Sequence, residues 1–124
     1  MALKGFENET ATLSQYELNE VLPIVICYLS GRIGKRMAIK NRYICQKIRE
    51  LDLEITEARI RKIINHIRVN NIIPCLIATS SGYYISYDKE ELNDYIDSLI
   101  GRRDAINAVI EAMIEQSERN NGKA

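Results

Sequence analysis

Histidine, tryptophan and phenylalanine are almost missing from this chain of 124 residues: His66 and Phe6 are single examples and there is no tryptophan. The sequence also lacks a nucleophile elbow, a phosphate-cradling glycine loop and paired His or Cys residues at metal-binding spacing. We therefore expect a protein that is not an enzyme, with no cofactor, no metal and no small-molecule substrate. Its core should be rich in isoleucine.

Long apolar runs and paired cysteines are missing as well. No stretch approaches the roughly 20 apolar residues of a membrane-spanning helix, and the start, MALKGFENET, lacks the apolar centre of a signal peptide. Cys27, Cys45 and Cys75 are odd in number, far apart and set among apolar neighbours, which favours reduced, buried thiols over disulfides. These features predict a cytoplasmic protein with no membrane contact.

The chain has no net charge, because 17 Lys and Arg balance 17 Asp and Glu, but its charges are segregated. Residues 32 to 71 carry a net charge of +7, whereas residues 1 to 31 carry −3 and residues 88 to 124 carry −4. A basic centre with acidic flanks is typical of a protein that presents one face to phosphates. The alternative is that these charges merely solvate helix faces.

Apolar residues at spacings of three and four predict a first helix that begins at Ser14. Ser14 and Glu17 fit a capping box, and Pro23 predicts a kink or restart inside the helix. Asn41 is the expected N-cap of a second helix, and Thr56 is the expected N-cap of a third, more basic helix after a short turn.

Two β-prone runs follow the third helix and are separated by Thr-Ser-Ser-Gly, which predicts a hairpin. Tyr83 and Tyr84 should alternate sides, with one ring in the core and the other partly exposed. Asp88 begins a long helix in which Gly101 is expected to allow a break. Its apolar spacing beyond that point predicts either a homodimer or a helix that folds back onto the first one.

The order of helix, turn, basic helix and hairpin predicts a mainly α fold with a small β-hairpin (α+β), a winged helix-turn-helix. We expect a mobile N-terminal segment over residues 1–13, the winged-helix domain over residues 14–100, and a C-terminal helical extension over residues 101–124. The extension is the expected dimerisation element.

The segment from residue 39 to residue 106 resembles the winged-helix domains of replisome-organiser and regulatory proteins of bacteriophages and mobile elements. The resemblance covers a little over half of the chain and is most specific at SSGYYIS and the acidic helix start that follows. It implies non-catalytic binding of double-stranded DNA in transcription regulation or replication initiation. The wing entry, NNIIPCLIA, is longer than usual in that group and predicts a longer first wing strand.

The third helix is the expected DNA reader, because its isoleucine stripe lies opposite a basic, hydrogen-bonding face. Basic residues before and at the start of the second helix are expected to contact phosphates, and two serines at the hairpin tip to contribute weakly. The candidate DNA-binding residues are Lys35, Arg36, Lys40, Arg42, Thr56, Ala58, Arg59, Arg61, Lys62, Asn65, Ser80 and Ser81. His66 is expected to lie on the surface beside them.

A protein–protein interaction module without direct DNA binding is the alternative to this reading, since the long last helix carries an apolar surface. The two functions differ in their dependence on salt. DNA binding releases counterions from phosphates and weakens steeply as salt rises, whereas an apolar protein interface responds little.

Overall fold

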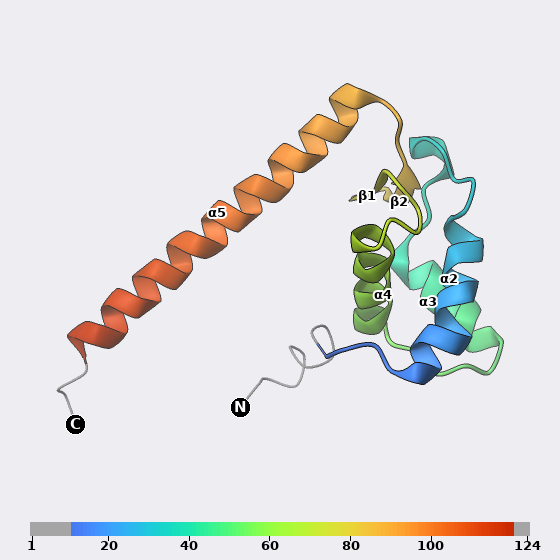
Figure 1. The fold of residues 1–124 in the computed structure, drawn as a ribbon, viewed down its shortest axis with the longest axis horizontal. Helices are drawn as coiled ribbons and strands as arrows, with labels where there is room; N and C mark the ends of the chain where they lie inside the picture. Colours follow the sequence, from blue (N-terminus) through green and yellow to red (C-terminus); the bar gives the residue numbers. More distant parts are fainter. Residues whose placement is uncertain (1–10, 121–124) are drawn as a thin grey trace. The chain divides into compact units, whose positions relative to one another are not determined.

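The computed structural model describes residues 11–120, and within them the chain is mainly helical with one two-stranded antiparallel hairpin, as the sequence predicts. In chain order the elements are the π-helical turn η1 (Glu17–Val21), α2 (Leu22–Leu29), the 3-10 turn η2 (Lys35–Met37), α3 (Asn41–Glu50), α4 (Glu57–Val69), β1 (Leu76–Thr79), β2 (Gly82–Ile85) and α5 (Lys89–Arg119) (Figure 1). Most of the segment predicted to be mobile, residues 1–13, lies outside the described residues.

Two compact units make up the chain, Met1–Tyr87, called the head below, and Asp88–Ala124, which contains α5. The boundary expected after residue 100 lies inside α5, and the break expected at Gly101 does not occur. A glycine inside a helix costs only about 1 kcal/mol relative to alanine, and α5 continues through it. No helix within residues 11–120 combines the length and the apolar character that a bilayer crossing requires.

The first helical segment begins as its sequence predicts. The backbone N–H of Ser14 donates to Glu17 Oε1 at 2.8 Å, and the backbone N–H of Glu17 donates to Ser14 Oγ at 3.1 Å, which confirms the capping box. The helix does not restart at Pro23: the π-helical turn η1 ends at Val21, α2 carries Pro23 in its first turn, and the backbone keeps helical dihedral angles through Val21 and Leu22. Proline has no N–H for the preceding turn, so the helix widens just before it.

Isoleucine dominates the core of the head, as expected. Most of the buried side chains form one cluster, to which η1, α2, α3, α4, the hairpin and the segments that connect them contribute. Its members are Val21, Val25, Leu29, Ile39, Ile44, Cys45, Ile48, Ile55, Ile60, Ile63, Ile64, Ile67, Ile73, Leu76, Tyr83 and Ile85. Of the three cysteines, which are free, Cys45 is buried and Cys75 half-buried, but Cys27 is exposed, so its expected burial is wrong.

The hairpin is held on both sides. Thr79 pairs with Gly82 across the tip, so Ser80 and Ser81 alone connect β1 to β2. On its other edge, β2 meets the segment before α3: the N–H of Ile39 donates to Tyr83 O at 3.0 Å, and the N–H of Tyr83 donates to Ile39 O at 2.8 Å. The strand β2 therefore has hydrogen-bonded neighbours along both edges.

Two expectations for the hairpin are wrong. Tyr83 and Tyr84 are both buried, at 8% and 1% exposure, so neither ring is the partly exposed one that was expected. The first strand is not lengthened, since β1 has only four residues. Before it, Asn71 and Cys75 have positive φ angles of 55° and 63°, so this backbone turns instead of extending.

Gly82 is required where the hairpin tip meets the segment before α3. Its φ is +120°, and a Cβ at this position would lie 2.5 Å from the carbonyl oxygen of Ile39. We expect Gly82→Ala to lower the free energy of unfolding by about 1–3 kcal/mol, because the two backbones must move apart. Gly31→Ala is the matched control, since Gly31 also has a positive φ but open space around it. Urea denaturation showing equal losses for the two variants would contradict the close approach.

Candidate nucleic-acid interface

The exposed face of α4 is polar and cationic. Its stripe of isoleucines at positions 60, 63, 64 and 67 is at most 1% exposed, so the orientation of the helix is fixed by the core. Arg61 and Asn65, one helical turn apart, are exposed, and Lys62 and Ala58 are half-exposed. Thr56 caps the helix as predicted, because its hydroxyl accepts a hydrogen bond from the N–H of Arg59 at 3.2 Å.

A second group of cations precedes and begins α3. Lys35 and Arg36 lie in η2, Lys40 stands just before α3, and Arg42 occupies its first turn. All four side chains are exposed. The first N–H groups of a helix add partial positive charge, so this end of α3 is suited to an anion.

Asn41 does not cap α3, which corrects the sequence prediction. The residue before it, Lys40, takes the N-cap position and no side chain caps the helix. Asn41 instead donates from Nδ2 to the carbonyl oxygen of Glu57 at 3.0 Å and accepts the Tyr83 hydroxyl at Oδ1 at 2.9 Å. One amide thus joins the start of α3, the start of α4 and the strand β2.

The structure brings several predicted residues together between α3 and the hairpin. Lys40, Arg42 and Ser80 line one hollow of about 490 Å³, which Asn41, Tyr83 and the acidic residue Glu57 also border. Ser80 is exposed and Ser81 half-exposed at the tip. Basic side chains and a hydroxyl around a shallow hollow are groups that hydrogen-bond phosphate oxygens.

Two polar residues beside this group were missed by the sequence analysis. Tyr43 and Gln46 line a neighbouring hollow together with Lys40 and Arg42. Both side chains are exposed on α3. The spacing could have identified Gln46, since it stands four residues after Arg42 and therefore on the same helix face.

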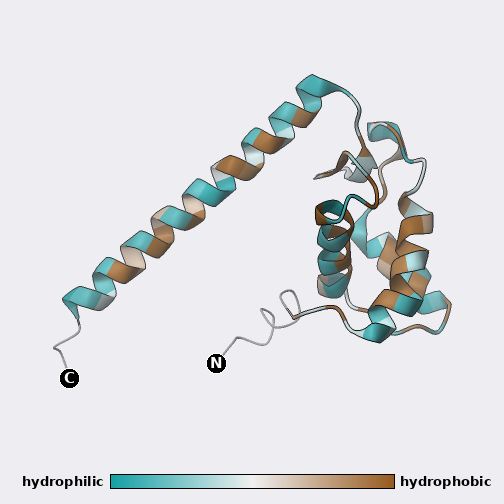
Figure 2. Cartoon of the chain, in the orientation of Figure 1, coloured by the Kyte–Doolittle hydropathy of each residue, from teal (hydrophilic) through white to brown (hydrophobic). Residues whose placement is uncertain are grey.

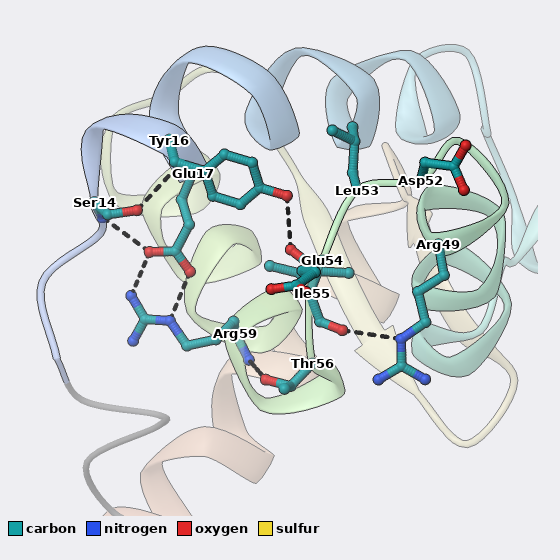
Figure 3. Close-up of a pocket in the computed structure, with 10 residues that line it drawn as sticks. All are labelled: Ser14, Tyr16, Glu17, Arg49, Asp52, Leu53, Glu54, Ile55, Thr56 and Arg59. Carbon is teal, nitrogen blue, oxygen red and sulfur yellow. Dashed lines mark hydrogen bonds and ion pairs between the residues drawn. The ribbon is translucent and has the colours of Figure 1, made fainter.

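Arg59 is committed to its own chain. Its Nε and Nη2 donate to the two carboxylate oxygens of Glu17, each at 2.7 Å (Figure 3). Its Nη1 and Nη2 also donate to the carbonyl oxygens of Ala11 and Thr12. The Arg59 and Glu17 side chains are only 13% and 9% exposed. We therefore leave Arg59 out of the candidate surface, because its donors hold the N-terminal segment to α4.

This ion pair lies beside a hollow of about 760 Å³ that the turn before α4 also borders. Figure 3 shows the Tyr16 ring over that turn, where its hydroxyl donates to Glu54 O at 2.8 Å. The Arg59 hydrogen bonds lower the pKa of Glu17, although burial opposes this, and the same pairing raises the pKa of Arg59. The beginning of the first helical segment is thereby fixed to the beginning of α4.

Glu17→Gln is expected to lower the free energy of unfolding at pH 7 by about 1.5–3 kcal/mol, the range for a hydrogen bond to a charged group. Because the folded-state pKa of Glu17 is lowered, its carboxylate stabilises the fold above its ordinary value of 4.5. This contribution is lost as the pH falls through the lowered value. Urea denaturation of wild type and variant should therefore converge in acid.

Glu20→Gln is the matched control, since Glu20 is exposed on the same helical turn. It removes one carboxylate without touching Arg59. A stability difference for Glu17→Gln that stayed constant from pH 7 into acid would show that the ion pair does not supply it.

The single histidine, His66, lies near this surface and takes part in a hydrogen bond within the head. His66 is half-exposed beside the polar face of α4, close to the expectation, and its carbonyl accepts the Asn70 amide at 2.8 Å. Within residues 11–120, no three Cys, His, Asp or Glu side chains gather in a way that would hold a metal ion.

Comparison of the chain with family models, with curated proteins and with solved structures finds no match.

Proposed function

We propose that the head is a winged helix-turn-helix that binds double-stranded DNA without catalysis. In this proposal α3, the turn and α4 form the helix-turn-helix, α4 enters the major groove, and the β1–β2 hairpin is the wing. The observation that carries the proposal is that one short segment, residues 35 to 65, has an apolar side in the core and a basic side toward solvent. Between residues 35 and 65 the isoleucines close the core, while the Lys and Arg side chains other than Arg59 remain half-exposed or exposed.

The exposed face of α4 carries the side chains that can read bases. Arg61 and Lys62 have donors that fit the O6 and N7 acceptors of guanine, and the Asn65 amide fits the N6 and N7 edge of adenine. Ala58, on the same side, is small enough to let the helix approach the groove closely. Thr56 serves the site by capping the helix that presents these residues.

Phosphate contacts are assigned to the cations around the start of α3. Lys35, Arg36, Lys40 and Arg42 can neutralise backbone charge and fix the position of α4 on the duplex. Ser80 and Ser81 carry no charge, so the wing is expected to add little affinity. This division predicts that most of the salt dependence comes from α3 and η2.

The biological role proposed is transcription regulation or replication initiation in a bacteriophage or mobile element, inside the cell. This assignment depends on the resemblance of the SSGYYIS wing and the acidic helix start, since DNA-binding chemistry alone does not separate the two roles.

A protein–protein interaction module is the second candidate, favoured by the exposed apolar side chains of α5. Retention of random genomic DNA fragments, followed by sequencing of those retained as salt is raised, distinguishes the two functions. A DNA-binding head should retain a subset of fragments that share a site. Retention of no fragment even at low salt would contradict the proposal and leave the interaction module.

A further inference from the structure

A hollow of about 470 Å³ lies at the start of α3, where Figure 2 shows hydrophilic residues. Three cations, an aromatic ring and an amide supply its polar lining, and these residues are Arg32, Lys40, Arg42, Tyr43 and Gln46. Within the part of the chain that the structure describes, no acidic side chain lines it, whereas Glu57 borders the neighbouring hollow beside Ser80. Three positive charges without a carboxylate favour a ligand that carries phosphate.

Arg32 is held beside this hollow by main-chain carbonyl groups. Its Nε donates to the carbonyl oxygen of Tyr28, and its Nη1 donates to that of Met37 at 3.1 Å. These acceptors carry no net charge, and within residues 11–120 no carboxylate forms an ion pair with Arg32, Lys40 or Arg42. The charge of all three side chains is therefore available to an anion.

Tyr43 adds an aromatic ring to this group of cations. It is 47% exposed, and the Lys47 ammonium lies 5.3 Å from the centroid of its ring. An exposed ring among phosphate-binding cations is the arrangement on which an unpaired base stacks, whereas the bases of an intact duplex stack on one another. Gln46 stands three residues after Tyr43, on the same side of α3, and its amide can hydrogen-bond the edge of a base.

This hollow shares Lys40 and Arg42 with the hollow that reaches Ser80 at the hairpin tip. A nucleic-acid strand carries one phosphate for each nucleotide, so the shared cations suit a strand that runs from one hollow into the other. A free nucleotide would occupy one hollow and leave the other empty. The continuity of the two hollows therefore favours a strand over a separate small molecule.

We propose that the hollow lined by Tyr43 binds an unpaired nucleotide of a DNA strand that continues from the duplex. The Tyr43 ring stacks on the base, and the Gln46 amide hydrogen-bonds the edge of that base. Arg32, Lys40 and Arg42 bind the phosphates beside it. This assignment rests on the proposed function, because the adjacent face takes the duplex. It adds a preference for duplex DNA with a single-stranded end.

Fluorescence anisotropy of the full chain with two labelled DNA probes tests the proposal. The probes share one duplex and carry a single-stranded tail of about six nucleotides, which is either abasic or has its bases, so that their charge is equal. The tail with bases should bind about fivefold or more tightly than the abasic tail, the effect of stacking one base on an aromatic ring. Tyr43→Leu should lower this ratio by about fivefold or more, and Tyr43→Phe, which keeps the ring, should retain it.

Tyr87→Leu is the matched control, since Tyr87 is 65% exposed in the head and does not line the hollow. It should leave the ratio of the two affinities unchanged. Circular dichroism verifies the fold of each variant.

Equal affinities of the wild type for the two tails would overturn the proposal, and so would a ratio that Tyr43→Leu leaves unchanged. An equal loss for Tyr43→Phe and Tyr43→Leu would overturn it too, because the ring would not be what holds the base. If a free deoxynucleoside monophosphate displaced the probe as effectively as unlabelled tailed duplex, the ligand would be a small molecule and the strand would be wrong.

Failure of the proposed function has a different result. A blunt duplex that stayed unbound even at low salt would contradict duplex binding. If single strands with and without bases still differed in affinity, and Tyr43→Leu removed the difference, base binding in the hollow would be supported independently of the duplex.

Discussion

Ile63→Ala is expected to lower the free energy of unfolding by about 2–5 kcal/mol, the largest stability change predicted for the head. The Ile63 side chain is fully buried in the cluster that joins α4 to α2, α3 and the hairpin. Removing three carbons there leaves a cavity that the surrounding branched side chains cannot readily fill. Urea denaturation with linear extrapolation measures the loss.

Asn65→Ala is the control for this experiment, because Asn65 is exposed on the same helix. Its stability should stay within about 0.5 kcal/mol of the wild type. If Ile63→Ala were as stable as the wild type, α4 would have to be rotated about its axis. The face assigned to DNA would then be wrong too.

Replacing Arg61 and Lys62 together by Ala is expected to weaken DNA binding by about 2 kcal/mol or more, roughly 30-fold, at low salt. Both side chains stand on the exposed side of α4, where alanine is well tolerated by the helix. The fold should therefore remain while the proposed base contacts are lost. Fluorescence anisotropy with a labelled duplex measures the affinity, and circular dichroism verifies the fold.

Lys89→Ala with Arg119→Ala makes the same change in net charge on α5 and serves as the matched control. If the two double variants weakened binding equally, the effect would come from overall charge. The helix α4 would then not be the reader.

Local patterns predicted most of the elements of the head. The capping box at Ser14, the Thr56 cap and the hairpin each depend on residues a few positions apart, although the hairpin tip has two residues instead of the four expected. The isoleucine spacing in α4 likewise predicts which side of the helix faces the core, because the four isoleucines all lie on that side. These contacts are short-range, so the sequence shows both partners together.

Contacts between distant residues could not be predicted in this way. Glu17 and Arg59 are 42 positions apart, and nothing near either residue indicates that Arg59 turns from the surface to hold the N-terminal segment. Asn41 has cap-forming chemistry, yet its partners are the Glu57 carbonyl and the Tyr83 hydroxyl. The pairing of β2 with the segment before α3 likewise joins residues that are far apart in the sequence.

The dependence of DNA affinity on salt tests the central proposal most directly. If Lys35, Arg36, Lys40 and Arg42 each neutralise a phosphate, the logarithm of the association constant should fall against the logarithm of the salt concentration with a slope of about −4. Removing any one of these side chains should reduce the slope by about 1. An affinity for duplex DNA that is unchanged between low and physiological salt would contradict the assignment of this surface to DNA.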